Sequence, residues 1–282
     1  MAGHMANTSR LPRLAWELRR LRLASGLSLH EAEKRLGLYA SSINRIERAV
    51  HQPQRRTVNL LLDAYGVTDP QQRAIVLSWL KPSGDDWVSE HEPYLSEHYS
   101  TYIRLEDSAE RVRTHESQFV PGLLQTEAYA RAAIGGADPD LAPDEVERLV
   151  RVRLQRQQVL TRPAPPRLWA VLDEAVIRRE VGGVGVMREQ LHRLAEAASA
   201  AHVTVQVLPF GAGAHPGMNG SLTVMDLGAP FGSTLAVTDS MTGDTLIHET
   251  AELARLATTF ERIAAQALDP AASATLIADA TA

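Results

Sequence analysis

The fold of the first part of this chain is decided by residues 18–53, LRRLRLASGLSLHEAEKRLGLYASSINRIERAVHQP. The spacing of apolar residues in this stretch predicts three short helices. Gly26 and Gly37 mark the turns between them, because glycine adopts the left-handed conformation that ends a helix at little cost. Ser28 and Glu31 have the spacing of a capping box, in which each side chain satisfies one free amide at the start of a helix. The stretch therefore predicts three helices joined by tight turns.

The third predicted helix, about residues 40–48, is apolar on one side only. Ile43 and Ile46 face inward, whereas small, polar and basic side chains remain outside or at the helix start. These are Ala40, Ser41, Ser42, Asn44, Arg45 and Arg48. A further helix is expected over about residues 54–65, with Tyr65 on its apolar stripe. This order is typical of a helix-turn-helix, whose second helix enters the major groove of DNA.

Charge divides the chain into a basic head and an acidic body. Residues 10–63 carry eleven basic and five acidic side chains, a net charge of +6. The whole chain has a net charge of −5, so the remainder carries −11. A basic segment confined to one end fits contact with phosphates at that end. Charge alone leaves open the alternative of a solvated basic face without a partner.

With these features the head resembles the DNA-binding domain of phage repressors and of XRE-type bacterial regulators. In that family a basic residue of the first helix pairs with a glutamate that closes the recognition helix, and Arg22 and Glu47 occupy those positions. The resemblance implies that Ala40, Ser41, Asn44 and Arg45 face the bases. It also implies phosphate contacts from Ser28, Tyr39, Ser42, Arg48, Arg55 and Arg56. Arg45 is suited to a bidentate contact with guanine, and Asn44 to an adenine edge.

The head departs from the family pattern at several positions. Glu33 stands where an alanine usually packs against the recognition helix, and Leu29 replaces a polar residue that touches phosphate. Tyr39 replaces the usual N-cap serine, and Ala49 replaces the glycine after the recognition helix. We therefore expect this helix to be less well capped than is usual in the family.

The sequence pattern of the body predicts an α+β fold. Period-two patterns indicate strands at residues 168–173 and 202–209, and the helix between them allows a parallel crossover. Strands at residues 221–227 and 233–239 are expected to form an antiparallel hairpin. Helices are expected at about residues 69–80, 86–106, 123–134, 143–160, 185–200, 249–267 and 270–280.

Two domains follow from this pattern. We predict an all-α N-terminal helix-turn-helix domain over residues 9–81, with a linker at residues 82–84. An α+β domain over residues 82–282 follows, with a small mixed β-sheet surrounded by helices.

The body also resembles a widespread actinobacterial module that follows XRE-type domains and was long described as a domain of unknown function. Six sequence blocks in order carry the resemblance over about residues 85–278, among them FVPGLLQTEAYARA (119–132) and VTVQVLPFGAGAHPGMNG (203–220). Such regulators are described as antitoxin-like and are often encoded beside a small partner protein. The resemblance therefore implies a partner or signal domain. A common Tyr-x-Glu motif appears here as Val-Thr-Asp at residues 237–239.

Candidate ligand or partner residues lie after the predicted strands. Glu174 and Arg178 follow the strand at residues 168–173, at the end of a strand where mixed sheets often bind ligands. His215 lies in the glycine-rich loop FGAGAHPGMNG, and Asp239 ends the last predicted strand. The alternative for these residues is a salt-bridged surface and a flexible turn.

Several other classes of function are disfavoured. The chain has no cysteine, which excludes disulfides and thiolate chemistry. It has no Gly-x-Ser-x-Gly elbow, Walker loop or His-Glu-x-x-His motif, so we expect no enzyme, no metal and no cofactor. Four His-Glu pairs, at residues 30–31, 91–92, 115–116 and 248–249, lack a second ligand at helical spacing. No apolar run approaches the roughly 18 residues that span a bilayer, and the start has no signal pattern, so we expect a cytoplasmic protein without membrane contact.

Together these observations predict a sequence-specific transcriptional regulator. We expect a homodimer that binds double-stranded DNA at a pseudo-palindromic operator, with a body that binds an effector or a small protein from a neighbouring gene. Two alternatives remain open. One is an antitoxin-like protein that sequesters a small partner and regulates its own expression, and the other is a small-molecule-sensing repressor.

Overall fold

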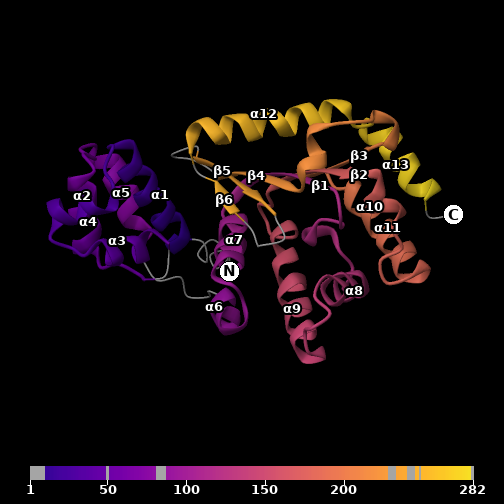
Figure 1. Ribbon diagram of the computed structural model, residues 1–282, viewed down its shortest axis with the longest axis horizontal. Helices are drawn as coiled ribbons and strands as arrows, with labels where there is room; N and C mark the ends of the chain where they lie inside the picture. Colours follow the sequence, from indigo (N-terminus) through magenta and orange to yellow (C-terminus); the bar gives the residue numbers. More distant parts are fainter. Residues whose placement is uncertain are drawn as a thin grey trace. The chain divides into compact units, whose positions relative to one another are not determined.

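The computed structural model describes residues 10–48, 51–80, 87–227, 233–239, 245–247 and 249–280. The chain forms two compact units, residues 1–108 and residues 109–282, which we call the N-terminal and C-terminal units (Figure 1). The predicted linker at residues 82–84, and with it the predicted domain boundary, lies outside the described residues.

The N-terminal unit is helical over its first part. Its helices are α1 (Arg10–Ala24), α2 (Leu29–Leu36), α3 (Ala40–Glu47), α4 (Arg55–Ala64) and α5 (Pro70–Ser78). Gly26 and Gly37 have φ values of 71° and 66°, as the predicted turns require. The Ser28–Glu31 capping box is formed at the start of α2. The predicted helices of this segment are therefore confirmed to within about two residues at each end.

The single long helix predicted over residues 86–106 is wrong. The chain forms α6 (Trp87–His91), the short 3-10 helix η1 (Glu92–Tyr94) and α7 (Glu97–Asp107) instead. Leu95 and Ser96 have extended backbones, and the Ser96 side chain accepts a hydrogen bond from the Tyr99 amide. The segment breaks because Pro93 lacks an amide proton and Ser96 caps a new helix.

A six-stranded mixed sheet organises the C-terminal unit, with strand order β3-β2-β1-β4-β5-β6 among the described residues. The strands are β1 (Ala109–Glu116), β2 (Arg167–Asp173), β3 (Val203–Leu208), β4 (Leu222–Leu227), β5 (Ser233–Thr238) and β6 (Thr245–Ile247). β1, β2 and β3 are parallel, whereas β4 is antiparallel to both β1 and β5. The predicted parallel crossover and antiparallel hairpin are both confirmed.

The central strand β1 was not predicted. It contains few apolar residues, and a register shift between Ala109 and Arg111 interrupts its alternation. Its polar side chains are satisfied by neighbouring strands. The Thr114 and Thr223 hydroxyls are 2.9 Å apart, and Arg113 donates to Asp226. These partners lie far away in the sequence, so no local pattern indicates a buried strand here.

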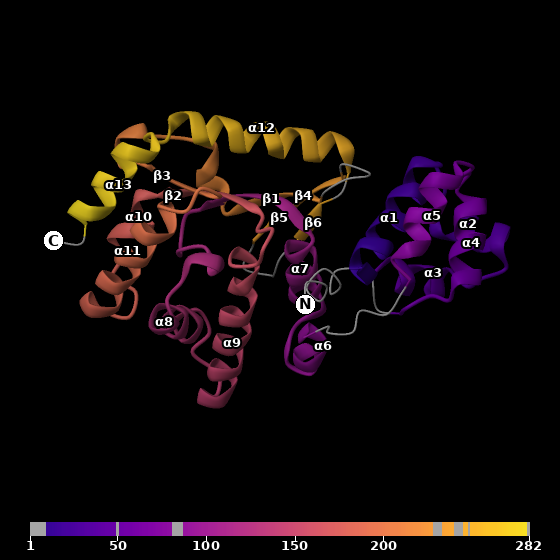
Figure 2. The ribbon, with the colours of Figure 1, turned by 180° about the vertical axis from the view of Figure 1, so that it is seen from behind.

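Helices cover both faces of the sheet. They are α8 (Glu127–Ala137), α9 (Pro143–Arg156), α10 (Glu174–Arg178), α11 (Val184–Ala198), α12 (Thr250–Gln266) and α13 (Pro270–Asp279). α12 runs across one face, and α8 to α11 lie on the other (Figures 1 and 2). Short 3-10 helices complete the connections: η2 (Gly122–Leu124), η3 (Gln157–Leu160), η4 (Phe210–Ala212) and η5 (Pro216–Asn219).

The core beneath α12 centres on Phe260. This side chain is fully buried and meets the Trp169 ring edge-on, with 5.3 Å between ring centroids. Val171, Val224 and Leu256 belong to the same buried cluster. The covering of the sheet by α12 therefore depends on one large side chain and its neighbours.

We expect Phe260→Ala to destabilise the C-terminal unit by about 3–5 kcal/mol, because it empties a large buried site. Phe210→Ala is the matched control, since Phe210 is 62% exposed in a loop of the same unit and its loss costs little. Urea unfolding of both variants measures the difference. Equal destabilisation by the two changes would contradict this description of the core.

Candidate functional site

Helix α3 presents a polar surface opposite its buried side. Ile43 and Ile46 are buried, with 0% and 3% of their surfaces exposed. The side chains at the predicted DNA-facing positions are solvent-accessible: Ser41, Ser42, Arg45 and Arg48 are exposed, and Ala40 and Asn44 are partly buried. Tyr39, just before the helix, is 76% exposed. The residues predicted to read bases therefore lie on or beside the open side of α3.

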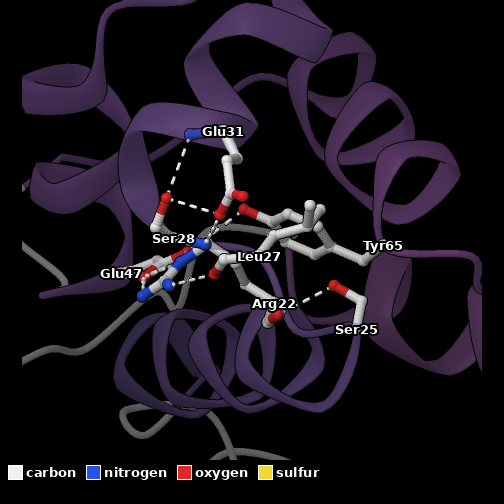
Figure 3. A network of polar contacts seen from close by, with 7 residues as sticks. All are labelled: Arg22, Ser25, Leu27, Ser28, Glu31, Glu47 and Tyr65. Atoms are coloured by element: carbon white, nitrogen blue, oxygen red, sulfur yellow. Dashed lines mark hydrogen bonds and ion pairs between the residues drawn. The ribbon is translucent and has the colours of Figure 1, made fainter.

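Glu47 closes α3 and is buried in a network of charge-assisted hydrogen bonds (Figure 3). Arg22 of α1 donates from Nε to Oε1 at 2.8 Å and from Nη2 to Oε2 at 2.8 Å. Its Nη1 donates to the Leu27 carbonyl at 2.7 Å, so three elements of the N-terminal unit meet at one guanidinium. The structure thus brings together the two residues that the family resemblance pairs. An exposed ion pair contributes about 0–1 kcal/mol to stability. A buried pair differs because loss of either partner leaves the other charge buried without compensation.

Tyr65, at the end of α4, adds a third contact to this carboxylate. Its hydroxyl lies 3.1 Å from Glu47 Oε1 and is the donor, because an ionised carboxylate only accepts. Burial, and then the charge of Glu47, raise the pKa of the Tyr65 phenol, so it keeps its proton. Burial by itself lowers the pKa of Arg22, but the hydrogen bonds to Glu47 and the charge of Glu47 together outweigh it, so the net shift is upward. Sequence reasoning placed Tyr65 only on an apolar stripe and missed this role.

The capping of the two helices differs. At the start of α2 the Ser28 hydroxyl donates to Glu31 Oε2 at 2.6 Å and accepts from the Glu31 amide at 3.2 Å. Its single proton is therefore used, and a phosphate contact from this hydroxyl would require that bond to break. At the start of α3, Tyr39 makes no side-chain capping bond, and the helix ends at Arg48 with φ −103°. The reduced capping predicted at the start of α3 is confirmed, whereas Ala49, on which the prediction for its end rested, lies outside the described residues.

Arg55 and Arg56 begin α4 and are exposed. The first turn of this helix has no acidic residue, and Gln54 makes no side-chain cap. Basic side chains at a helix N-terminus lie next to the positive end of the helix dipole, which is unfavourable for the isolated helix. This position becomes favourable when an anion binds there.

In the C-terminal unit, the predicted ligand residues share one edge of the sheet. The parallel strands β1, β2 and β3 end there, and so does β5, because two antiparallel steps return it to the direction of β1. Glu174 follows β2 and Asp239 follows β5. Glu174 accepts from Arg178 Nε at 3.2 Å and from the Phe210 amide at 2.9 Å. Glu174 and Asp239 thus follow strand ends at this edge, and Arg178 lies beside Glu174.

The loop that contains His215 is fixed to this edge by two histidines. His215 has a side chain only 6% exposed, with Nε2 3.5 Å from Asp173 Oδ2. His115, at the end of β1, is buried, with Nδ1 3.1 Å from the Val171 carbonyl and Nε2 3.2 Å from the Gly217 carbonyl. Burial lowers the pKa of His115. The predicted flexible turn around His215 is therefore held against the sheet.

Glu116 also belongs to this edge and was not predicted as a site residue. Burial, and then the nearby charge of Asp239, raise its pKa to about 7, against hydrogen bonds to Ser221 and Thr114 that lower it. The only sequence signal was its place in a His-Glu pair, which was considered as a metal motif.

Within the described ranges, no three His, Asp or Glu side chains lie close enough together to hold a metal ion. Across those same ranges, no helix combines the length and apolarity that crossing a membrane requires.

Each of the two units contains a region that matches a protein-family model. A model described as a domain of unknown function (DUF5753) matches residues 99–279, and a helix-turn-helix domain model matches residues 13–75. The chain belongs to the DUF5753 family. Comparisons with curated proteins and with solved structures found no match. The DUF5753 region contains the whole sheet and the edge that carries Glu116, Glu174, His215 and Asp239, while the helix-turn-helix region contains the Arg22–Glu47–Tyr65 network.

The shifted pKa of Glu116 predicts a pH dependence of stability. An unshifted glutamate has a pKa of 4.5, whereas burial in the folded state raises the pKa of Glu116 to about 7. Between these values the folded state holds a proton that the unfolded state has lost, so this group's stabilising contribution is full below pH 4.5 and falls as pH rises to 7. Glu116→Gln should therefore raise the free energy of unfolding at pH 8, by up to about 3 kcal/mol, and change it little at pH 4.

Chemical unfolding of both proteins across this pH range provides the measurement. Glu110→Gln, at an exposed position of the same strand, is the control and should leave the pH profile unchanged. A profile for Glu116→Gln parallel to that of the parent chain would contradict the shift.

Proposed function

We propose that this chain is a sequence-specific transcriptional regulator of the XRE type that binds double-stranded DNA through α3. The observation that carries the proposal is the opposition of two surfaces on one short helix. Its inner side is anchored by Ile43, Ile46 and the buried Glu47, while Asn44 and Arg45 lie toward the accessible side. A recognition helix needs this combination, because base contacts require a rigid helix with polar side chains left for the groove.

Within this proposal Arg45 and Asn44 are the main base readers. An exposed guanidinium suits the two acceptors of guanine, and a carboxamide suits adenine. Ala40 and Ser41 lie at the start of the same helix and contact neighbouring base edges. Helix α3 therefore brings few strong base readers, and specificity rests on a small number of contacts.

Phosphate contacts come from the surrounding basic and polar residues. Arg55 and Arg56 gain most from a bound phosphate, since it offsets their unfavourable place at the start of α4. Tyr39 and Arg48 flank α3, Ser42 lies in its first turn, and the three contact the DNA backbone beside the groove. Ser28 contributes less, because its hydroxyl proton is already donated to Glu31.

The protein acts as a homodimer in this proposal. Two α3 helices then enter successive major grooves, about 34–36 Å apart, on a pseudo-palindromic operator. Pairing compensates for the small number of base contacts that each copy makes.

A second candidate role, antitoxin-like binding of a small protein partner, concerns the C-terminal unit. It is favoured by the loop at residues 209–220, which exposes two large apolar side chains while being fixed to the sheet edge. Phe210 is 62% exposed and Met218 is 70% exposed. Glu174 holds the Phe210 amide, and His115 lies against the Gly217 carbonyl. Apolar side chains held out on a fixed loop suit a protein partner, whose anchor residues are commonly large and apolar. Sensing of a small effector at the same edge is the alternative.

Arg45→Ala tests the DNA-binding proposal. The operator is first selected from random duplexes with the full-length chain, and binding of each variant is then titrated. We expect Arg45→Ala to weaken operator binding by about 1–3 kcal/mol and to relax the preference at one base pair. Arg55→Ala is the comparison, and should weaken all duplexes alike and reduce the salt slope by about one. Unchanged affinity and base preference in Arg45→Ala would contradict readout by α3.

Replacement of Phe210 and Met218 by alanine tests the second role. Small proteins encoded by the neighbouring genes are co-expressed with the full-length chain, and we expect one of them to form a complex with the parent chain that the double variant loses. Val184→Ala removes a side chain of 56% exposure outside the loop and should keep the complex. No complex with the parent chain, or an equal one with the double variant, would contradict partner binding through this loop.

A further inference from the structure

The carboxylate of Glu47 is held from two directions. On one side, α1 contributes Arg22, whose guanidinium contacts both carboxylate oxygens at 2.8–3.1 Å. On the other, α4 contributes the Tyr65 hydroxyl at 3.1 Å from Oε1. Both side chains are buried, with 6% and 5% of their surfaces exposed. Water therefore does not replace either contact freely.

These two contacts do different things. Arg22 is itself fixed by the Leu27 carbonyl, and its fork keeps the carboxylate in one plane. This planar pair does not by itself prevent α3 from rotating about the line that joins the Arg22 guanidinium to the Glu47 carboxylate. The Tyr65 hydroxyl approaches from another helix and removes that freedom. The two contacts together thus restrain the orientation of α3 more than either does alone.

The caps of α3 add little to its orientation. Its N-cap residue, Tyr39, makes no side-chain capping bond, and its C-cap, Arg48, lacks the left-handed glycine geometry that closes α2. Ile43 and Ile46 supply apolar packing, which is less directional than hydrogen bonding. Asn44 lies one turn before Glu47 on the same short helix, so a change in tilt at Glu47 also moves the base-reading residues.

We propose that Tyr65 is a positioning residue for DNA sequence discrimination, acting through its hydrogen bond to Glu47. It touches no base. It holds α3 at the tilt that lets Arg45 and Asn44 meet base edges, whereas phosphate contacts from Arg55 and Arg56 tolerate a small change of tilt. This inference rests on the proposed function, since it concerns how the same helix achieves specificity.

Tyr65→Phe in the full-length chain is the test, because it removes one oxygen and keeps the buried ring. Binding is titrated at one salt concentration to the selected operator and to a scrambled duplex of equal length. We expect operator affinity to fall about tenfold, which corresponds to about 1.4 kcal/mol, and scrambled-duplex affinity to change less than twofold. The salt slope should stay the same, since no phosphate contact is lost. The ratio of the two affinities is the readout that a merely structural role would not move.

Tyr102→Phe is the matched control, because it removes a comparable tyrosine hydroxyl, 3.2 Å from Glu106, in α7. It should leave the affinity ratio unchanged. Glu47→Leu, which leaves no acceptor for the Tyr65 hydroxyl, is combined with Tyr65→Phe in a double-mutant cycle, and Tyr65→Phe should have little further effect on the ratio in that background. If Glu47→Leu does not fold, the comparison of Tyr65→Phe with Tyr102→Phe decides by itself.

Three results would overturn the inference. One is an unchanged affinity ratio in Tyr65→Phe, and another is an equal loss of affinity for both duplexes. The third is a full effect of Tyr65→Phe in the Glu47→Leu background. A parent chain that selects no sequence from random DNA overturns the proposed function as well, which separates that failure from one confined to Tyr65.

Discussion

The N-terminal unit depends on one buried carboxylate and the donors that surround it. Removing Glu47 from water is costly, and the cost is offset because Arg22 and Tyr65 together supply hydrogen bonds to both of its oxygens. Loss of one partner of such a pair generally costs about 3–5 kcal/mol, since the other charge is left buried alone. The same network joins α1, the turn before α2, α3 and α4. The contacts that hold the helices of this unit together are therefore the same contacts that orient α3.

The parts of the fold that local chemistry determines could be predicted from the sequence. The capping box at Ser28 and the glycine at residue 37 act within a few residues, and α2 begins and ends where they indicate. β1 could not be predicted, because its polar side chains are made acceptable by Thr223 and Asp226 of a strand more than 100 residues away. The long helix was predicted wrongly because Pro93 and Ser96, which divide it, were not taken as a helix breaker and a helix cap.

In the candidate sites, too, features set by nearby residues could be predicted and features set by distant residues could not. Arg22 and Glu47 were paired through a family resemblance, and not through anything in their spacing. The hydroxyl of Tyr65 matters only because α4 folds back to Glu47, so its position on an apolar stripe concealed it. In the C-terminal unit, Glu174 and Asp239 were suggested one by one from strand ends. The sheet topology brings these ends to one edge, and it adds Glu116, whose raised pKa depends on burial and on Asp239.

Hydrogen–deuterium exchange of the full-length chain, with and without the operator selected from random duplexes, tests the central claim most directly. Amides at the DNA-facing helix should exchange more slowly when DNA is bound. The account predicts protection concentrated in residues 39–48 and at the start of α4 with the operator, and weaker protection of α3 with a scrambled duplex. Protection confined to residues 109–282, or equal protection of α3 by both duplexes, would contradict sequence recognition by this helix.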